Sequence, residues 1–371
     1  MRPAQILILT VPHGAAHERM GLTLKKSLAS ARPDVPVSVI NVLDHCSGWF
    51  RTYYNSYQLP LKYWPALWER IEGYQHTHTA TGPGWLYRQA AKPLARLLRG
   101  LHPDVVVATE VGMCELAALV KKQDSPGFRL AAVPTGIDTD LPWVQSEVDL
   151  YVAEPHRVAP FLEAQGVPPS KILACGVPVD TGFGSLPNRA AVRAVLGLDA
   201  GLPVLLVLFG GAGIGKPQRL IAGLKKLQAH VQTVWITGRN ASLRRQIEQH
   251  LASHNHTRIL GWTDNMHEWM AAADLLLGKP GSGTLLEAMN SGLPILAFDP
   301  LPGIERRHCD LIEKWQIGRW IKHPEKIAET IDGLLSHPEK LQNLRANALK
   351  LASPGAAQRA ARAILSLLPG G

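Results

Sequence analysis

The 371-residue sequence predicts an α/β protein built from two doubly wound domains. Short apolar runs alternate with segments of helical periodicity along most of the chain, which is typical of parallel sheets covered by helices. The alternation begins at residues 6–11, is interrupted by a connection containing Pro, Gly and Asn at residues 184–188, and restarts at residues 204–209. We therefore expect domains at residues 1–184 and 185–353, followed by a basic amphipathic helix at residues 354–371.

Composition narrows the range of partners and compartments. The formal net charge of +9 favours an anionic partner, whether a phosphorylated substrate, an acidic membrane surface or a nucleic acid. Lys and Arg never occur in blocks longer than two, so we expect no nucleic-acid partner. The four cysteines form no C-x-x-C pair, which indicates reduced thiols in the cytoplasm and argues against structural zinc. No apolar run approaches the ~20 residues that span a bilayer, so any membrane contact comes from one side.

In the first domain we expect strands at residues 6–11, 35–43, 103–108, 129–133, 150–153 and 172–175, and a helix at residues 114–122. Residues just past the carboxyl end of a strand line the crevice of such a sheet. This rule places His17 there, either as a general base or as a plain loop histidine. The strand at residues 103–108 ends at Thr109-Glu110, and Glu110 is a second candidate for the base if it is desolvated in a closed cleft. Asp138-Thr139-Asp140 is a D-x-D, which holds Mg²⁺ on a sugar diphosphate in some enzymes, but so short a motif arises by chance and we expect no metal.

Residues 46–100 are rich in Trp, Tyr, Lys and Arg and poor in acid. Aromatic rings beside cationic side chains suit the headgroup level of an anionic bilayer. The same composition also fits a pair of helices with aromatic core residues, or a surface on which nucleic-acid bases stack. The basic helix at residues 354–371 has two interpretations as well, packing across the domains or membrane contact. The candidate residues for the membrane or a lipid acceptor are Trp49, Lys62, Trp64, Trp68, Arg70, Trp85 and Arg88.

The second domain opens with a strand at residues 204–209 and the loop GGAGIGKP. The loop matches a phosphate-binding P-loop until Pro217, which replaces the hydroxyl residue that binds Mg²⁺. We expect Pro217 in the first turn of a helix, no ATP hydrolysis, and backbone N–H groups such as that of Gly211 still able to meet phosphate. Further strands are expected at residues 233–237 and 258–260, and Asp264 or Asn265 is expected to cap the next helix.

The stretch at residues 274–299 reads as strand, glycine-rich turn, helix, turn and strand. A helix that begins behind glycines presents free N–H groups and the positive end of its dipole to a phosphate. Ser282 or Thr284 can cap this helix, which ends at Gly292. Glu287 lies on the same helix face as Gly283 and can bind a ribose diol, or else it lies in solvent on an ordinary connection.

Three passages together resemble glycosyltransferase family 28, in the branch of bacterial and plastid diacylglycerol glycosyltransferases that includes the monogalactosyldiacylglycerol synthases. They are the Gly14-x-x-His17 turn, the pair VWITGRN and LGWTDNMHEWMAAADLLLGKPGSGTLLEA, and GLPILAFDPLPGIE. The likeness covers nearly the whole chain. It implies a GT-B fold, with two Rossmann-like domains facing across a cleft, and an inverting transfer from a sugar nucleotide without a metal or cofactor.

The resemblance also implies roles for individual residues. These are Gly281, Ser282, Gly283 and Thr284 for the diphosphate, Glu287 for the ribose, Arg239, Asn240, Asn265 and Met266 for the uracil, Pro302, Gly303 and Glu305 for the donor sugar, and Gly14 and His17 beside the diphosphate and acceptor. Lys279, just before the glycine turn, can add its positive charge at the departing diphosphate. Two departures stand out. Ile304 replaces the amide of the usual P-G-Q-E, and Thr135-Gly136 replaces a T-D, so that Asp138, Asp140 or Glu110 takes the part of the missing acid.

These expectations combine into one function. The sequence predicts an inverting transferase that moves galactose or glucose from a UDP-sugar to diacylglycerol, on an anionic membrane surface at the inner face of the cell membrane. The E-x7-E of many retaining enzymes is absent, because the eighth residue after Glu287 is Ile295. The alternatives are a polyprenyl-linked or soluble acceptor, a UDP-sugar 2-epimerase, and a nucleotide-sugar-binding protein without catalysis.

Overall fold

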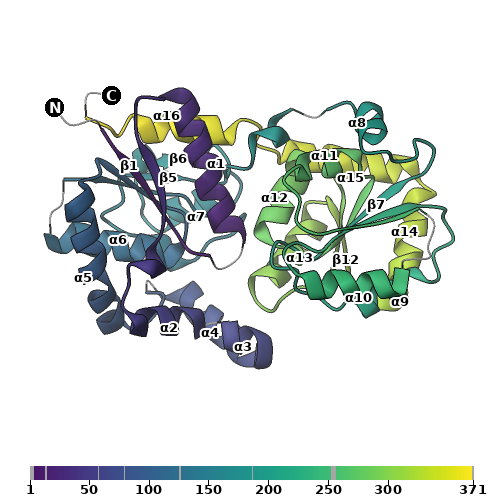
Figure 1. The fold of residues 1–371 in the computed structure, drawn as a ribbon, viewed down its shortest axis with the longest axis horizontal. Helices are drawn as coiled ribbons and strands as arrows, with labels where there is room; N and C mark the ends of the chain where they lie inside the picture. The colour runs from purple at the N-terminus through teal and green to yellow at the C-terminus, as the bar shows by residue number, and fades with distance from the viewer. Residues whose placement is uncertain are drawn as a thin grey trace. The chain divides into compact units, whose positions relative to one another are not determined.

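The structure, a computed structural model, describes residues 4–12, 15–56, 58–78, 80–124, 127–185, 187–251 and 256–369. The chain divides into two compact units, with Met1–Thr181 and Gly355–Gly371 in unit 1 and Gly182–Pro354 in unit 2. The first division lies three residues before the boundary expected at residue 184. Each unit contains a six-stranded parallel sheet covered by helices (Figure 1), so the prediction of two doubly wound domains is confirmed.

In unit 1 the strands run in the order β2-β1-β3-β4-β5-β6. The strands are β1 (Ile6–Thr10), β2 (Val37–Asn41), β3 (Val105–Ala108), β4 (Arg129–Ala132), β5 (Leu150–Val152) and β6 (Ile172–Leu173). The helices of this unit are α1 (Ala15–Ala31), α2 (Gly48–Ser56), α3 (Gln58–Tyr63), α4 (Pro65–Thr77), α5 (Gly84–Leu101), α6 (Val111–Asp124), α7 (Val158–Ala164) and α16 (Ala356–Leu365). Short 3₁₀ helices lie at Val42–Asp44, Leu141–Trp143 and Pro169–Lys171, and a fourth, Thr181–Gly184, lies at the division between the units. Among its described residues, the aromatic segment at 46–100 thus contains the four helices α2 to α5, not a pair.

Alternation along β1 explains how the sheet of unit 1 is covered. Leu7 and Leu9 point into the core formed with α5, α6 and α7. Ile8 lies on the other face, where Gly21 of α1 packs against it. Because successive strand residues point to opposite faces, both sides of β1 are apolar and both are covered.

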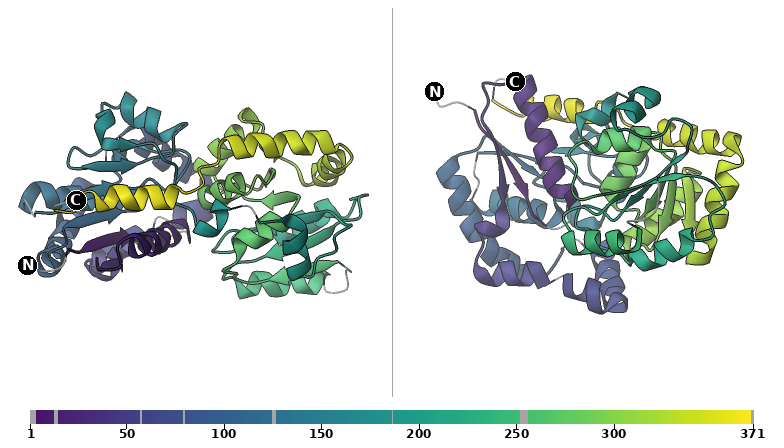
Figure 2. Two further views of the ribbon diagram at one scale, coloured as in Figure 1. Left: turned by 90° about the horizontal axis from the view of Figure 1, so that it is seen from above. Right: turned by 45° about the vertical axis from the view of Figure 1, so that its right-hand side comes forward.

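The last helix, α16, belongs to unit 1 and packs along α1 (Figure 2). Its buried side consists of small alanines and Ile364, a surface that permits close helix packing. The apolar face of this helix is therefore buried within unit 1, and its contact with a membrane or with the other domain stays a prediction. Within the part of the chain that the structure describes, no helix is long and apolar enough to cross a bilayer.

In unit 2 the strand order is β12-β11-β10-β7-β8-β9. The strands are β7 (Val204–Leu208), β8 (Gln232–Ile236), β9 (Thr257–Leu260), β10 (Leu275–Gly278), β11 (Ile295–Phe298) and β12 (Gly318–Ile321). The helices are α8 (Arg189–Val195), α9 (Pro217–Leu224), α10 (Ala241–Leu251), α11 (Met266–Ala272), α12 (Ser282–Asn290), α13 (Ile304–Lys314), α14 (Ile327–Leu335) and α15 (Pro338–Lys350), with a 3₁₀ turn at Pro324–Lys326. Pro217 opens α9 as predicted, whereas β12 was not predicted.

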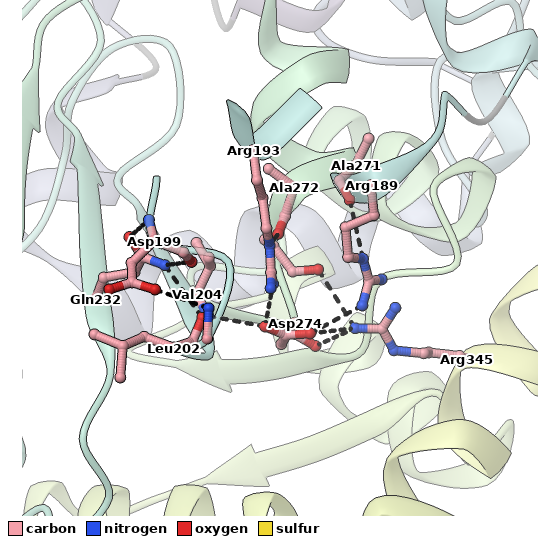
Figure 3. A network of polar contacts seen from close by, with 12 residues as sticks. Arg189, Arg193, Asp199, Leu202, Val204, Gln232, Ala271, Ala272, Asp274 and Arg345 are labelled. Atoms are coloured by element: carbon pink, nitrogen blue, oxygen red, sulfur yellow. Dashed lines mark hydrogen bonds and ion pairs between the residues drawn. The ribbon is translucent and has the colours of Figure 1, made fainter. Parts of the chain in front are cut away.

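A carboxylate surrounded by arginines fixes the amino-terminal end of the unit 2 sheet (Figure 3). Asp274, just before β10, is 2.9 Å from Arg189, 2.5 Å from Arg193 and 3.1 Å from Arg345. It also accepts a hydrogen bond of 2.8 Å from the N–H of Val204 at the start of β7. The arginines donate further to carbonyl groups at the carboxyl end of α11, which have no partners within that helix. This cluster ties α8 and α15 to the two central strands.

Candidate active site

Each sheet has one point where the strand order reverses, and both points carry predicted site residues. In unit 1 the chain goes from β1 to β2 on one side and to β3 on the other. In unit 2 it goes from β7 to β8 on one side and later to β10 on the other. Ligands of open α/β sheets bind at the carboxyl ends of the strands at such points. His17 and Glu110 follow β1 and β3, and Lys279 follows β10.

A pocket of about 320 Å³ lies at the reversal point of unit 1. This volume is at the lower end of the range of small-molecule sites. The pocket brings His17 and Glu110 together with Trp68 and Ile71 of α4. Its remaining lining residues are Val11, Tyr53, Tyr54, Ser56, Pro60, Thr81, Tyr87 and Val111. An apolar wall with a few polar groups suits a ligand that is mostly hydrocarbon and carries a polar end.

The ring of His17 is held in a defined orientation. Its Nδ1 is 2.8 Å from the carbonyl oxygen of Thr109 and 3.1 Å from the hydroxyl of Thr135. A carbonyl oxygen can only accept, so the hydrogen-bond pattern assigns the proton of the neutral ring to Nδ1. Nε2 then carries the lone pair, which a general base requires.

Glu110 is buried at the start of α6, and one of its oxygens accepts a hydrogen bond of 3.1 Å from the N–H of Met113. Its carboxylate therefore lies at the positive end of a helix. A second acid, Glu115, is buried one turn further along and accepts hydrogen bonds from the N–H and hydroxyl of Thr81, at 3.0 and 2.5 Å. Burial raises the pKa of Glu115, and the charge of Glu110 raises it further against the hydrogen bonds from Thr81.

Sequence reasoning missed Glu115, although one signal was present. It is the only charged residue in the otherwise apolar run at residues 111–120. A lone acid in such a run is buried unless the helix turns that face outward, and a buried acid needs a partner.

The loop after β4 contributes differently from what the D-x-D suggested. Asp138 is buried and is 3.3 Å from a guanidinium nitrogen of Arg157. Of Asp138, Asp140 and Glu110, only Glu110 is among the residues that line the pocket. The loop reaches His17 through Thr135 instead, a contact that sequence reasoning did not anticipate.

The aromatic helices expose part of their side chains. Trp49, Trp64 and Trp85 are 82%, 59% and 56% exposed. Trp68 points into the pocket, so α4 carries both a pocket residue and, at Trp64 just before its first turn, an exposed aromatic. Arg70 and Arg88 are exposed, whereas Gly14 and the side chain of Lys62 lie outside the described residues.

In unit 2 the glycine turn leaves the start of α12 open. The helix begins at Ser282, its N-cap residue is Gly281, and no side chain caps it. The expectation that Ser282 or Thr284 caps this helix is therefore wrong, because the capping position falls on a residue without a side chain. Without a cap, the N–H groups of the first turn remain available to a phosphate.

Two residues of α13 hold this turn in place. His308 is fully buried, and its Nδ1 is 2.7 Å from the carbonyl oxygen of Pro280. Glu305 accepts a hydrogen bond of 2.6 Å from the N–H of Leu301 and lies against Gly281. The helix begins at Ile304, because Gly303 (φ 83°) turns the chain into it just after Pro302.

A buried lysine accompanies the turn. Burial lowers the pKa of Lys279, and the charges of Glu305 and Asp299 oppose that effect. Burial likewise raises the pKa of Glu305. On the following helix, Glu287 is buried and is not in solvent, which removes the second of its two interpretations. Lys279 and Glu305 thus place one basic and one acidic side chain beside the turn that leads into α12, and Glu287 is a buried acid of that helix.

The loops after β7 and β8 interlock. A Cβ atom on Gly213 would lie 2.3 Å from the carbonyl oxygen of Thr237, so only glycine fits there. The side chain of Asn240 donates to the carbonyl of Gly213 at 2.8 Å, and the carbonyl of Gly211 accepts from the N–H of Arg239 at 3.1 Å. The Asn240 amide therefore holds the glycine-rich loop after β7 in place.

The other candidates for the uracil pocket are Arg239, which follows β8, and Asn265 and Met266, which follow β9. The guanidinium of Arg239 lies 4.3 Å from the centre of the Trp262 ring, a cation–π contact. Asn265 is at the N-cap position of α11, directly before Met266, but its side chain binds Glu268 and Trp269 and no N–H of the first turn. The expected side-chain cap is therefore absent, since Asp264 instead accepts from the Trp262 indole.

Two family models match the chain. Residues 17–179 match monogalactosyldiacylglycerol (MGDG) synthase, and residues 216–351 match glycosyl transferases group 1. A processive diacylglycerol beta-glucosyltransferase of Staphylococcus saprophyticus is 24% identical over 92% of this chain and 87% of its own. Monogalactosyldiacylglycerol synthase 3, chloroplastic, of Arabidopsis thaliana is 28% identical over 74% of this chain and 63% of its own.

Solved structures are similar in fold. MurG of Acinetobacter baumannii superposes with a TM-score of 0.63 at 14% identity, covering 98% of this chain and 100% of that one. HepE of Anabaena, in complex with UDP-glucose, gives 0.56 at 17% identity with the same coverage. The fold and the family models make this protein a glycosyltransferase with a GT-B fold. Within that class it is related to the diacylglycerol glucosyltransferases and the MGDG synthases, so the resemblance is confirmed.

Proposed function

We propose that the protein transfers galactose or glucose from a UDP-sugar to the hydroxyl of diacylglycerol, with inversion at the anomeric carbon. The observation that carries the proposal is the pocket of unit 1, where a positioned histidine meets an apolar wall on a helix next to exposed aromatics. The relatives named for diacylglycerol and the neighbour bound to UDP-glucose support the two substrates.

His17 is the general base for the lipid acceptor. Its Nε2 takes the proton from the lipid hydroxyl as that oxygen attacks the anomeric carbon. The imidazolium that forms keeps its Nδ1–H on the carbonyl of Thr109. Glu110 lies in the same wall, where its negative charge stabilises that positive charge.

The donor side follows from α12. As the bond between the anomeric carbon and the diphosphate oxygen breaks, its electron pair leaves with UDP. The open amino terminus of α12 and the ammonium of Lys279 stabilise the departing charge. Glu287 binds the ribose, and Pro302, Gly303 and Glu305 form the loop beside the donor sugar. Arg239 and Met266 border the uracil.

The membrane side follows from the helices around the pocket. Trp49, Trp64 and Trp85 suit the headgroup level of a bilayer, and Arg70 and Arg88 suit anionic lipid. The protein would dock there from the cytoplasm and admit only the glycerol end of the lipid, because a pocket of about 320 Å³ is small for two acyl chains. If activity were unchanged by removing anionic lipid and by Arg70→Gln with Arg88→Gln, docking through this surface would fail.

A radiolabelled transfer assay tests the function. Purified protein receives UDP-glucose or UDP-galactose and liposomes of diacylglycerol with or without anionic phospholipid. We expect labelled glycolipid with one donor preferred, and a loss of at least a hundredfold in His17→Ala, on the scale of a general base. His156→Ala, an exposed histidine of the same unit, is the matched control. No label in lipid with either donor would overturn the proposal.

A further inference from the structure

The pocket of unit 1 carries negative charge without a lysine or arginine among its described lining residues. Glu110 forms part of the wall, and Glu115 lies behind Thr81, another wall residue. Both carboxyl groups are buried, at 7% and 6% exposure. Charges in such a place act strongly, because little water screens them.

The two acids act on the same space. The negative charge of Glu110 raises the pKa of Glu115. Tyr87, which lines the pocket, has a pKa raised by burial first and then by the charges of Glu115 and Glu110. A negative group brought into the pocket would meet the same repulsion as the tyrosinate.

The outside of the same helices has the opposite charge. Residues 46–100 contain seven Lys and Arg against two Asp and Glu. Arg70 on α4 and Arg88 on α5 are exposed, while Trp68 and Ile71 of α4 face the pocket. Anionic lipid is therefore attracted to the outer surface and repelled from the interior.

We propose that Glu110 and Glu115 restrict the acceptor pocket to uncharged, hydroxyl-bearing lipid heads and exclude lipid phosphates and diphosphates. This rests on the proposed function, because it takes the pocket to be the acceptor site. It follows that anionic phospholipid acts only at the outer surface and does not compete with the acceptor. Polyprenyl diphosphates are excluded for the same reason.

Binding of short-chain lipids tests the proposal apart from catalysis. Dioctanoylglycerol and dioctanoyl phosphatidic acid share their chains and differ in the phosphate. Equilibrium dialysis below the micellar concentration gives the ratio of their dissociation constants. We expect the phosphate to bind the wild-type protein at least about tenfold more weakly, the scale of one charge at low screening.

Glu115→Gln should reduce that ratio by about tenfold, because the amide keeps an oxygen for Thr81 and removes the charge. Glu163→Gln, on the exposed side of α7, changes the net charge equally and should leave the ratio unchanged. Should Glu115→Gln fail to fold, Glu110→Gln gives the same binding comparison. Equal binding of the two lipids by the wild type, or equal shifts in Glu115→Gln and Glu163→Gln, would overturn the proposal.

The transfer assay separates this proposal from the function on which it rests. Transfer to diacylglycerol with a flat binding ratio would reject the charge filter and leave the function standing. A steep ratio that Glu115→Gln reduces, without any transfer, would support the filter and reject the function. Competitive inhibition of transfer by phosphatidic acid in the wild type would also reject the filter.

Discussion

The ring of His17 is oriented by the backbone of Thr109, whose carbonyl oxygen is 2.8 Å from Nδ1. In many catalytic sites a carboxylate orients the histidine ring in this way. A carbonyl fixes the same tautomer without adding a negative charge. It also cannot be removed by substituting the Thr109 side chain, so the partner open to mutation is the hydroxyl of Thr135, 3.1 Å from the same nitrogen.

Replacing Thr135 by Val should lower kcat roughly tenfold, because a ring free to rotate spends less time with Nε2 toward the acceptor. The KM for the UDP-sugar should stay the same, since no contact of the donor site changes. Thr135→Ser, which restores the hydroxyl, should recover most of the rate. Steady-state kinetics of the three proteins decide this, and a serine variant as slow as the valine variant would contradict a positioning role.

Donor binding should weaken at high pH because of Lys279. Burial lowers the pKa of this lysine, so it loses its charge at a lower pH than an ordinary lysine. The Lys279 ammonium, which we propose stabilises the diphosphate, is present below the folded pKa and is lost as pH rises through it. Calorimetric titration with UDP between about pH 7 and 10 measures the effect.

Two variants separate Lys279 from other titrating groups in that experiment. Lys279→Arg keeps its charge throughout the range, because a guanidinium loses its proton only above about pH 12. Lys279→Gln has no charge at any pH and subtracts the titration of the nucleotide itself. Identical pH profiles in wild type and Lys279→Gln would show that Lys279 does not contribute.

Local sequence was sufficient to predict most of the fold. Strands β1, β3, β7 and β10 are short, buried apolar runs between turn residues, and the rule for strand ends placed His17 beside the crevice. Strand β12 was not predicted, because Gly and Arg leave only two apolar residues in its sequence, GRWI. The caps were wrong where glycine took the N-cap position, since the sequence offers several hydroxyl residues within one turn.

Contacts between distant segments could not be predicted. Thr135 and His17 are 118 residues apart, and His308 and Pro280 are 28 apart on different elements. Nothing in either local sequence specifies the partner, because the contact depends on which strands are neighbours and how the helices pack. The same is true of α16, whose alanine face would suit either another helix or a bilayer until its place on α1 is known.

Substitution of Ile304 should show whether the departure from P-G-Q-E determines the preference between UDP-galactose and UDP-glucose. It is the first residue of α13, directly before Glu305, and is half-buried. Ile304→Gln places an amide in the loop that we propose holds the donor sugar, and it should change the ratio of kcat/KM for UDP-galactose and UDP-glucose roughly tenfold. Ile304→Leu keeps an apolar side chain and should not change it. Affinity for UDP should be equal in all three, and an unchanged ratio in Ile304→Gln would remove this position from donor selection.

The arginine cluster around Asp274 should dominate the stability of unit 2. Asp274→Asn leaves Arg189, Arg193 and Arg345 without a countercharge, and breaking a partly buried ion pair in this way costs about 3 kcal/mol. Hydrogen exchange of peptides containing β7 and β10 measures the opening free energy there. Asp34→Asn, whose partner Arg32 is exposed, is the matched control and should leave exchange unchanged. Equal protection in the two variants would show that the cluster adds no stability, because its desolvation cost then offsets its charge pairing.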